Sequence, residues 1–135
     1  MSEPHHPTPG ADPATALAVA MDHHEHGRVE AAAQAYQQAL AQSPDDAQAL
    51  HMYGMLHGQF GSRPQALALI GRAIALHPGE ANFHNNLGNV LQEDGQLAAA
   101  EASYRQAVAL DPARADARNN LAVLLARQGD DAQAE

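Results

Sequence analysis

The chain repeats itself every 34 residues, and this period limits its folds more than any other feature. The glycines that share the period are Gly27, Gly61, Gly95 and Gly129, and the prolines are Pro44, Pro78 and Pro112. Small residues follow the same spacing as Ala20, Gly54, Gly88 and Ala122, and again as Ala32, Ala66, Ala100 and Ala134. Such a period indicates a stack of similar units, each packed against its neighbours.

Each repeat is predicted to contain two helices joined by a turn. The segments between the glycines and prolines are rich in Ala, Leu and Gln, which favour helix, and their apolar residues recur three and four positions apart. First helices are expected at 14–26, 47–60, 81–94 and 115–128, and second helices at 29–42, 64–76 and 97–110. Each periodic glycine is expected to end a first helix in the left-handed conformation, and Pro64 to open a second helix.

The periodic small residues predict close helix packing within each repeat. Gly54 would face Ala66, and Gly88 would face Ala100, so that the two helices of a repeat approach closely. The larger residues Tyr36, Ile70 and Tyr104 would fill the gaps that remain. This pattern is typical of antiparallel helix pairs stacked in a row.

The same residues resemble the tetratricopeptide signature, W-x2-L-G-x2-Y, then A-x3-F, then P. The third repeat matches it with His84, Leu87, Gly88, Leu91, Ala100, Tyr104 and Pro112. The second matches with Leu50, Tyr53, Gly54, His57, Ala66, Ile70 and Pro78. Trp is absent, and His23 and His57 stand where Tyr is usual.

The resemblance covers residues 13–135, which divide into repeats at 13–46, 47–80, 81–114 and a partial one at 115–135. It implies an all-α solenoid of antiparallel helix pairs, about 3.5 repeats long, wound as a right-handed superhelix. The first helices would line a concave groove that binds a protein or peptide. The chain is therefore expected to be a scaffold or adaptor module.

Composition excludes several kinds of partner. The 135 residues fit one domain, and the net charge of −9, with no Lys, argues against nucleic acid. There is no Cys, no basic and apolar leader and no apolar stretch long enough to cross a membrane, so a cytoplasmic location is expected. Residues 1–12 are expected to be a disordered lead-in because they are rich in Pro, Gly and polar residues. The abundance of Ala and the lack of Lys indicate a bacterial source.

No catalytic residue, metal site or cofactor is predicted. His23 and His26 lie one helical turn apart and could share a metal, but a third fixed ligand is missing and Gly27 follows directly. The chain has no Walker loop, G-x-S-x-G, H-E-x-x-H or Gly-rich dinucleotide turn, so it is not expected to be an enzyme by itself. The pairs Asp45–Asp46 and Asp130–Asp131 are expected at turns between helices, where Asp caps helix N-termini.

Asparagine is unusually frequent in the segment NNLGNVLQEDGQL, residues 85–97, which lies in a predicted first helix. At 100° per residue, Asn82, Asn86, Asn89 and Glu93 share one stripe, and an apolar stripe that includes Leu87 lies on another part of the helix. Asn disfavours helix by roughly 0.6 kcal/mol relative to Ala, so a stripe of them indicates use. Stacking would align this stripe with first helices on either side, giving the predicted peptide-binding residues Gln48, Met52, Met55, Gln59, Asn82, Asn86, Asn89, Glu93, Asn120 and Arg127.

Each carboxamide could bond the N–H and C=O groups of an extended peptide, while Met52 and Met55 adapt to apolar side chains. Replacing Asn86 and Asn120 with Ala is then expected to weaken binding without loss of stability. The alternative is a merely solvated face, and a helix or folded surface also remains open as the ligand. The clamp for the C-terminal carboxylate of heat-shock chaperones is not expected, because the first two first helices present Leu17, Met21, His51, Met52 and Met55.

A second reading is an arm of a longer enzyme. Asn86 and Asn120, in NNLG and NNLA, resemble the asparagine ladder in the repeat arm of O-linked N-acetylglucosamine transferases and their bacterial relatives, whose catalytic domain is C-terminal. Ala18 and Met52 interrupt the ladder in the first two repeats.

The last repeat is expected to be incompletely covered. Residues 130–135 could form only a stub of a second helix, which would leave Leu121, Leu124 and Leu125 more exposed than Leu87 and Leu91. Self-association or fraying is therefore expected at this end.

Overall fold

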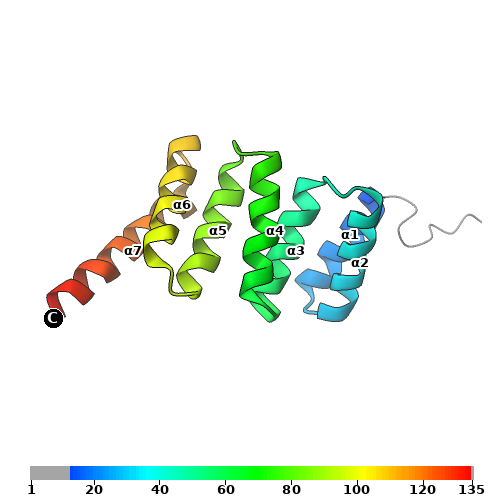
Figure 1. The fold of residues 1–135 in the computed structure, drawn as a ribbon, viewed down its shortest axis with the longest axis horizontal. Coiled ribbons are helices and arrows are strands. Elements are labelled where there is room, and N and C mark those ends of the chain that lie inside the picture. Colours follow the sequence, from blue (N-terminus) through cyan, green and yellow to red (C-terminus); the bar gives the residue numbers. More distant parts are fainter. Residues whose placement is uncertain (1–12, 135) are drawn as a thin grey trace, which may run out of the picture. The chain divides into compact units, whose positions relative to one another are not determined.

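All regular secondary structure in the described part of the chain is helical. The computed structural model describes the backbone of residues 13–134 and the side chains of residues 14–129, and in this part it has seven helices and no strand (Figure 1). The helices are α1 (Pro13–Glu25), α2 (Val29–Gln42), α3 (Ala47–Phe60), α4 (Arg63–Leu76), α5 (Ala81–Glu93), α6 (Leu97–Leu110) and α7 (Ala115–Ala134). The first six agree with the predicted ranges to within one residue. The expected lead-in at 1–12 lies outside the described residues.

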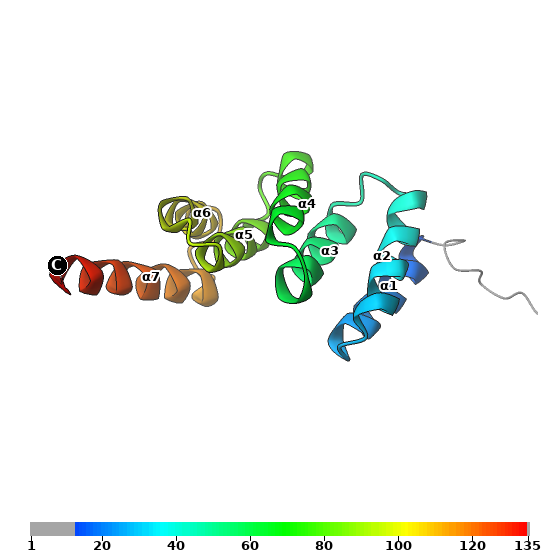
Figure 2. The ribbon, with the colours of Figure 1, turned by 60° about the horizontal axis from the view of Figure 1, so that its bottom comes forward.

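The chain divides into two compact units, one ending at Leu76 and the other beginning at His77. In the first unit α1 packs against α2, α3 packs against α4, and α2 also contacts α3. In the second unit α5 packs against α6, and α6 packs against α7. The pairs α1–α2, α3–α4 and α5–α6 are antiparallel hairpins (Figure 2). The predicted all-α repeat of helix pairs is confirmed.

Two glycines allow the helices of a pair to come close together. A Cβ on Gly88 would lie 2.5 Å from Cε1 of Tyr104, and a Cβ on Gly54 would lie 2.7 Å from Cγ1 of Ile70. Both larger side chains are fully buried. A Cβ on Gly54 would also lie 3.2 Å from the Ala66 carbonyl oxygen, so Gly54 faces Ala66 as predicted. The nearest atoms to a Cβ on Gly88 belong to Tyr104 and not to Ala100.

The turn after the first helix is made in two ways. Gly27 and Gly95 have φ of 73° and 80°, so they end α1 and α5 in the left-handed conformation as predicted. The prediction is wrong for Gly61, whose φ is −150°. Only two residues join α3 to α4, and the second, Ser62, already starts α4 by accepting the Gln65 N–H at its Oγ, 3.3 Å away. The short link leaves no room for a left-handed turn.

The C-terminal helix also departs from expectation. α7 continues through Gly129 to Ala134, so Asp130 and Asp131 lie within a helix and not at a turn, and no second helix begins there. A lone glycine disfavours helix by only about 1 kcal/mol relative to Ala, and no proline follows it in α7 to end the helix. By contrast, Asp46 caps α3 as predicted, since its Oδ1 accepts the Ala49 N–H at 3.2 Å.

The apolar residues of α7 are unequally covered. Leu124 is fully buried, so the expectation that it would lack cover is wrong, because it lies on the side of α7 that faces the unit. Leu125 is 38% exposed, against 8% for Leu91 one repeat earlier, and Val123 is 56% exposed. The C-terminal half of α7 projects past α5 and α6 in both views (Figures 1 and 2).

Candidate functional site

Three asparagines of α5 form a row of touching carboxamides. Asn82, Asn86 and Asn89 are half-buried and lie on one face of the helix, as their spacing predicts. Asn86 Nδ2 donates to Asn82 Oδ1 at 3.4 Å, and Asn89 Nδ2 donates to Asn86 Oδ1 at 3.5 Å. These long bonds are weak individually, but they align the three amides along the helix.

The next first helix adds a fourth carboxamide to this row. Asn120 of α7 donates from Nδ2 to Asn89 Oδ1 at 3.3 Å and to Asn85 Oδ1 at 3.0 Å. The structure therefore brings together four of the predicted residues, Asn82, Asn86, Asn89 and Asn120, from two helices of the second unit.

Asn85 was not among the predicted site residues, yet it lies at the centre of this arrangement. Its side chain is buried, with 3% of the residue exposed, and its Nδ2 donates to Asp116 Oδ2 at 3.4 Å. A buried amide without partners would be costly, so these bonds matter for stability. The repeat period could have indicated its role, because Asp116 and Asn120 lie 31 and 35 residues later, at neighbouring positions of the next first helix.

The α6–α7 turn contributes a second residue that sequence reasoning missed, Arg114. Its NH2 group donates to Asn82 Oδ1 at 2.9 Å, and its Nε lies 3.0 Å from Asp116 Oδ1. Asp116 Oδ1 also accepts the Ala117 N–H at 2.8 Å. Arg114 and Asp116 thus join the start of α7 to α5. We call these groups the amide network: Asn82, Asn85, Asn86, Asn89, Asn120, Arg114 and Asp116.

Tyr104 of α6 holds the far end of the amide network. Its hydroxyl oxygen lies 2.7 Å from Asn89 Oδ1 and 2.9 Å from Gln92 Oε1. The hydroxyl has one proton, so it can donate to only one of these oxygens at a time. Burial and the nearby carboxylate of Glu93 raise the pKa of Tyr104, which keeps the hydroxyl a donor at neutral pH.

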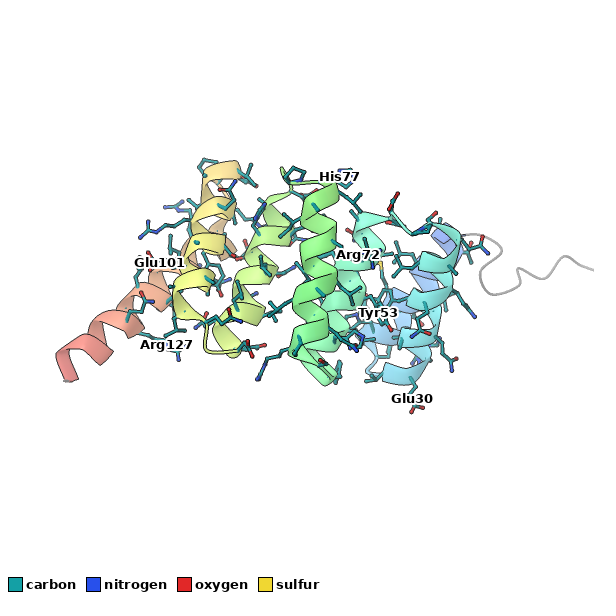
Figure 3. The ribbon with its side chains drawn as sticks, viewed as in Figure 1. Glu30, Tyr53, Arg72, His77, Glu101 and Arg127 are labelled. Atoms are coloured by element: carbon teal, nitrogen blue, oxygen red, sulfur yellow. The ribbon has the colours of Figure 1, made fainter. Side chains whose placement is uncertain are left out.

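The other predicted residues of the second unit, Glu93 and Arg127, are exposed. Arg127 extends from α7 into solvent (Figure 3). Among the described hydrogen bonds, none joins these two side chains to the amide network. They lie on the same helices as the network without being part of it.

The four predicted residues on α3 belong to the first unit, and two of them already take part in its packing. Met52 is partly buried against the core cluster that includes Tyr36 and Leu56. Gln59 is exposed, and its Oε1 lies 2.9 Å from Nε2 of His24. Met55 is partly buried and Gln48 is exposed. Of these four residues, Gln48 and Gln59 are exposed, and Met52 and Met55 are partly buried.

Aromatic rings join the first two repeats near these residues. Tyr53 (labelled in Figure 3) stacks on a ring of α2 and contacts one of α3. The first is Tyr36, at 5.7 Å between ring centres, and the second is His57, at 4.7 Å. His24 is edge-on to Tyr36, and its Nδ1 lies 2.8 Å from the Tyr36 hydroxyl. Thus His57, at a position where Tyr is usual, still packs as an aromatic ring.

The DHHEH segment makes contacts within its own turn. Arg28 donates from Nε to His23 Nδ1 at 2.7 Å and from NH2 to Asp22 Oδ2 at 2.8 Å. His26 Nδ1 lies 2.8 Å from the Asp22 carbonyl oxygen. In the described part of the chain, no group of three or more His, Cys, Asp or Glu side chains is placed to hold a metal. No helix of that part is long and apolar enough to span a membrane.

Comparison with known families and structures agrees with this geometry. A family model described as tetratricopeptide repeat matches residues 23–90, and a second, described as TPR repeat, matches residues 93–129. No curated protein matches the chain.

Among solved structures, the chain is 39% identical to a mutant O-GlcNAc transferase from Thermobaculum terrenum, with a TM-score of 0.79 over 84% of this chain and 22% of that one. The chain thus spans about a fifth of the length of that enzyme. It also resembles the Yersinia enterocolitica type III secretion chaperone SycD in complex with a YopD peptide, at 16% identity and a TM-score of 0.77 over 85% of this chain and 93% of that one.

The first tetratricopeptide domain of Spaghetti (RPAP3), bound to an HSP90 peptide, is 14% identical with a TM-score of 0.81 over 87% of this chain and 93% of that one. At such identities these two structures bear on the fold alone. The family match over residues 23–90 agrees with the 34-residue period and with the helix pairs that pack closely at glycine. The chain belongs to the tetratricopeptide repeat family.

Proposed function

We propose that this interaction scaffold binds an extended peptide along the amide network of α5 and α7. The observation that carries the proposal is the row of half-buried carboxamides, Asn82, Asn86, Asn89 and Asn120, aligned by hydrogen bonds on a surface that solvent still reaches. Asparagine is a poor helix former, so keeping this row in a helix disfavours folding unless the amides are used. The structures of SycD and of the first RPAP3 domain each contain a bound peptide, which supports a peptide as the class of ligand.

Carboxamides suit a ligand that is recognised through its backbone. Each offers donors and an acceptor, so a row of them can pair with successive peptide groups and tolerate varied side chains. In the proposal the exposed Glu93 and Arg127 would contact charged side chains of the peptide. Within the first unit, Gln48, Met52, Met55 and Gln59 on α3 are proposed as the peptide-binding residues. The two methionines would adapt to apolar side chains.

Replacing both Asn86 and Asn120 with alanine should weaken binding by at least about 1 kcal/mol, the value of one lost hydrogen bond. Isothermal calorimetry with a peptide selected from a random-sequence display library measures the change. Asn119→Ala, at the exposed neighbouring position, is the matched control and should leave the affinity unchanged. Equal affinity of the double variant and the wild type would contradict the proposal.

The hydrogen bonds of the amide network change the expected stability of the variant in which both Asn86 and Asn120 are alanine. Removal of the Asn120 donors leaves Asn85 Oδ1 buried with one fewer partner, which costs about 1–3 kcal/mol. The two alanines return only about 0.6 kcal/mol each through helix propensity. We therefore expect a small loss of stability with unchanged helical content, in place of the neutral or higher melting temperature that the sequence predicts.

A second candidate function is that of a substrate-recognition arm in a longer O-GlcNAc-transferase-like glycosyltransferase. The 39% identity to the Thermobaculum terrenum enzyme and the NNLG and NNLA segments favour it. Catalysis would then reside in another domain, with no catalytic residue in this chain. Sequencing of the gene beyond the codon for Glu135 tests this candidate, and a stop codon there would exclude it.

We also propose that copies of the chain associate through α7. The composition of the chain favours a bacterial source and a cytoplasmic location. Val123 and Leu125 are exposed on this helix, and Ala122 occupies the repeat position at which Gly88 receives Tyr104. Light scattering should show a concentration-dependent increase in mass that Val123→Ser with Leu125→Ser abolishes. A monodisperse monomer at high concentration would exclude self-association.

A further inference from the structure

The hydrogen bonds of the amide network fix which end of each carboxamide faces inward. Arginine can only donate, so the Asn82 atom that lies 2.9 Å from Arg114 NH2 must be the oxygen. The Asn86 Nδ2 donates to the same oxygen. Asn82 Nδ2, with its two N–H donors, is therefore on the opposite side of the carboxamide from Arg114.

The orientation of Asn120 follows from a longer chain of contacts. An ionised carboxylate only accepts hydrogen bonds, so the Asn85 atom that faces Asp116 is Nδ2. Asn85 Oδ1 is then the atom that meets Asn120, which must present Nδ2. Asn89 Oδ1 accepts from the same Nδ2, and this leaves Asn120 Oδ1 on the side away from Asn85 and Asn89.

We propose that Arg114, Asp116 and Asn85 are positioning residues that give the amide network a fixed polarity, in which Asn82 donates to a ligand and Asn120 accepts from it. The inference rests on the proposed function, and it narrows the ligand. A peptide backbone supplies the complement, a carbonyl oxygen for Asn82 and an N–H for Asn120. A chain whose backbone nitrogens are methylated lacks the second group and should be rejected.

The polarity can be tested first without any ligand, through the isosteric change of Asn to Asp. Asn82→Asp places a carboxylate oxygen against Arg114 and Asn86 Nδ2, both donors, so the melting temperature should stay the same or rise. Asn120→Asp places an oxygen against the oxygens of Asn85 and Asn89, so the melting temperature should fall by several degrees. Asn119→Asp, exposed on α7, controls for the added charge.

A second substitution tests whether Asp116 and Asn85 relay the orientation. Asn85 cannot turn to accommodate Asn120→Asp, because its oxygen would then face the Asp116 carboxylate. Adding Asp116→Asn removes this obstacle, since the turned Asn85 could donate to position 120 and accept from the amide at position 116. The double variant Asp116→Asn with Asn120→Asp, which has the wild-type net charge, should regain most of the lost melting temperature. The proposed polarity would be overturned if this double variant did not regain melting temperature. It would also be overturned if Asn82→Asp and Asn120→Asp changed the melting temperature equally.

Binding measurements distinguish failure of this inference from failure of the proposed function. With a peptide selected from the display library, Asn82→Asp should lower the affinity by about ten-fold or more while the fold is kept, and Asn119→Asp should change it by less than about two-fold. Two methylated forms of the peptide should be compared, one with methyl groups on the odd-numbered backbone nitrogens and one with methyl groups on the even-numbered ones. At least one of the two should not bind. If the stability results hold but no library peptide binds the wild type, the proposed function fails and the polarity stands. If the peptide binds and Asn82→Asp leaves its affinity unchanged, Asn82 is not a ligand-facing donor and the inference fails.

Discussion

Replacement of Gly88 by alanine should lower the free energy of unfolding by about 2 kcal/mol. The new Cβ would lie 2.5 Å from Cε1 and 2.6 Å from Cδ1 of Tyr104, well inside van der Waals contact. The ring is fully buried, and its hydroxyl is bonded to Asn89 and Gln92, so it cannot move aside without loss of those contacts. Overpacking of this kind costs about 1–3 kcal/mol, and loss of the hydroxyl bonds adds about 1 kcal/mol, against a gain of about 1 kcal/mol in helix propensity.

Gly71→Ala is the matched control, and it should have the opposite sign. Gly71 lies in α4, is exposed, and a Cβ there would meet no atom within 4 Å. Alanine at such a position raises the free energy of unfolding by up to about 1 kcal/mol. Urea unfolding followed by circular dichroism compares the two variants with the wild type. A neutral or stabilising Gly88→Ala would show that α5 and α6 are not packed as closely as described.

The second large effect is a loss of stability in mild acid, caused by His51. Its side chain is almost fully buried, with 1% of the residue exposed, and this burial lowers the pKa to about 4 from an ordinary value of 6.5. Between these two values the unfolded chain binds a proton that the folded chain does not. The free energy of unfolding should therefore be greatest above pH 6.5 and fall by up to roughly 3 kcal/mol as the pH is lowered towards 4.

Urea titrations at pH 7.5, 6, 5 and 4.5 measure this slope. His51→Leu should flatten the part of it that lies between pH 6.5 and 5, and the remaining slope includes a contribution from His57, whose pKa is also lowered by burial. His77→Gln removes an exposed histidine and serves as the matched control (Figure 3). An unchanged slope in His51→Leu would mean that His51 is hydrated or charged in the folded state.

The sequence predicted the elements of this fold because each repeat carries its own boundaries. Asp46 caps a helix by itself, Gly27 and Gly95 end one, and Gly54 faces Ala66 within the same hairpin, so local chemistry was sufficient. The prediction that Gly129 ends a helix failed because it used only the local sequence. A glycine ends a helix only when the following residues pack as a new element, and that information is not local.

The candidate site could be predicted only in part, for a different reason. A helical projection of α5 places Asn82, Asn86 and Asn89 on one face, and the structure agrees. The projection treats one helix at a time, so it could not show that Asn85 is buried by α7 or that Arg114 reaches back from the next turn. These two residues act through partners 31 to 35 positions away.

The contacts of His24 bear on how the first unit loses its structure. His24 of α1 meets Tyr36 of α2 and Gln59 of α3, and Tyr36 in turn stacks on Tyr53 of α3. Opening α1 and α2 alone would strip partners from α3, because these side chains cross from one repeat to the next. A repeat array whose interfaces are strong unfolds in blocks larger than one repeat. We therefore expect α1 to α4 to open as a single cooperative block, so that amide protons of both hairpins exchange with solvent at similar rates.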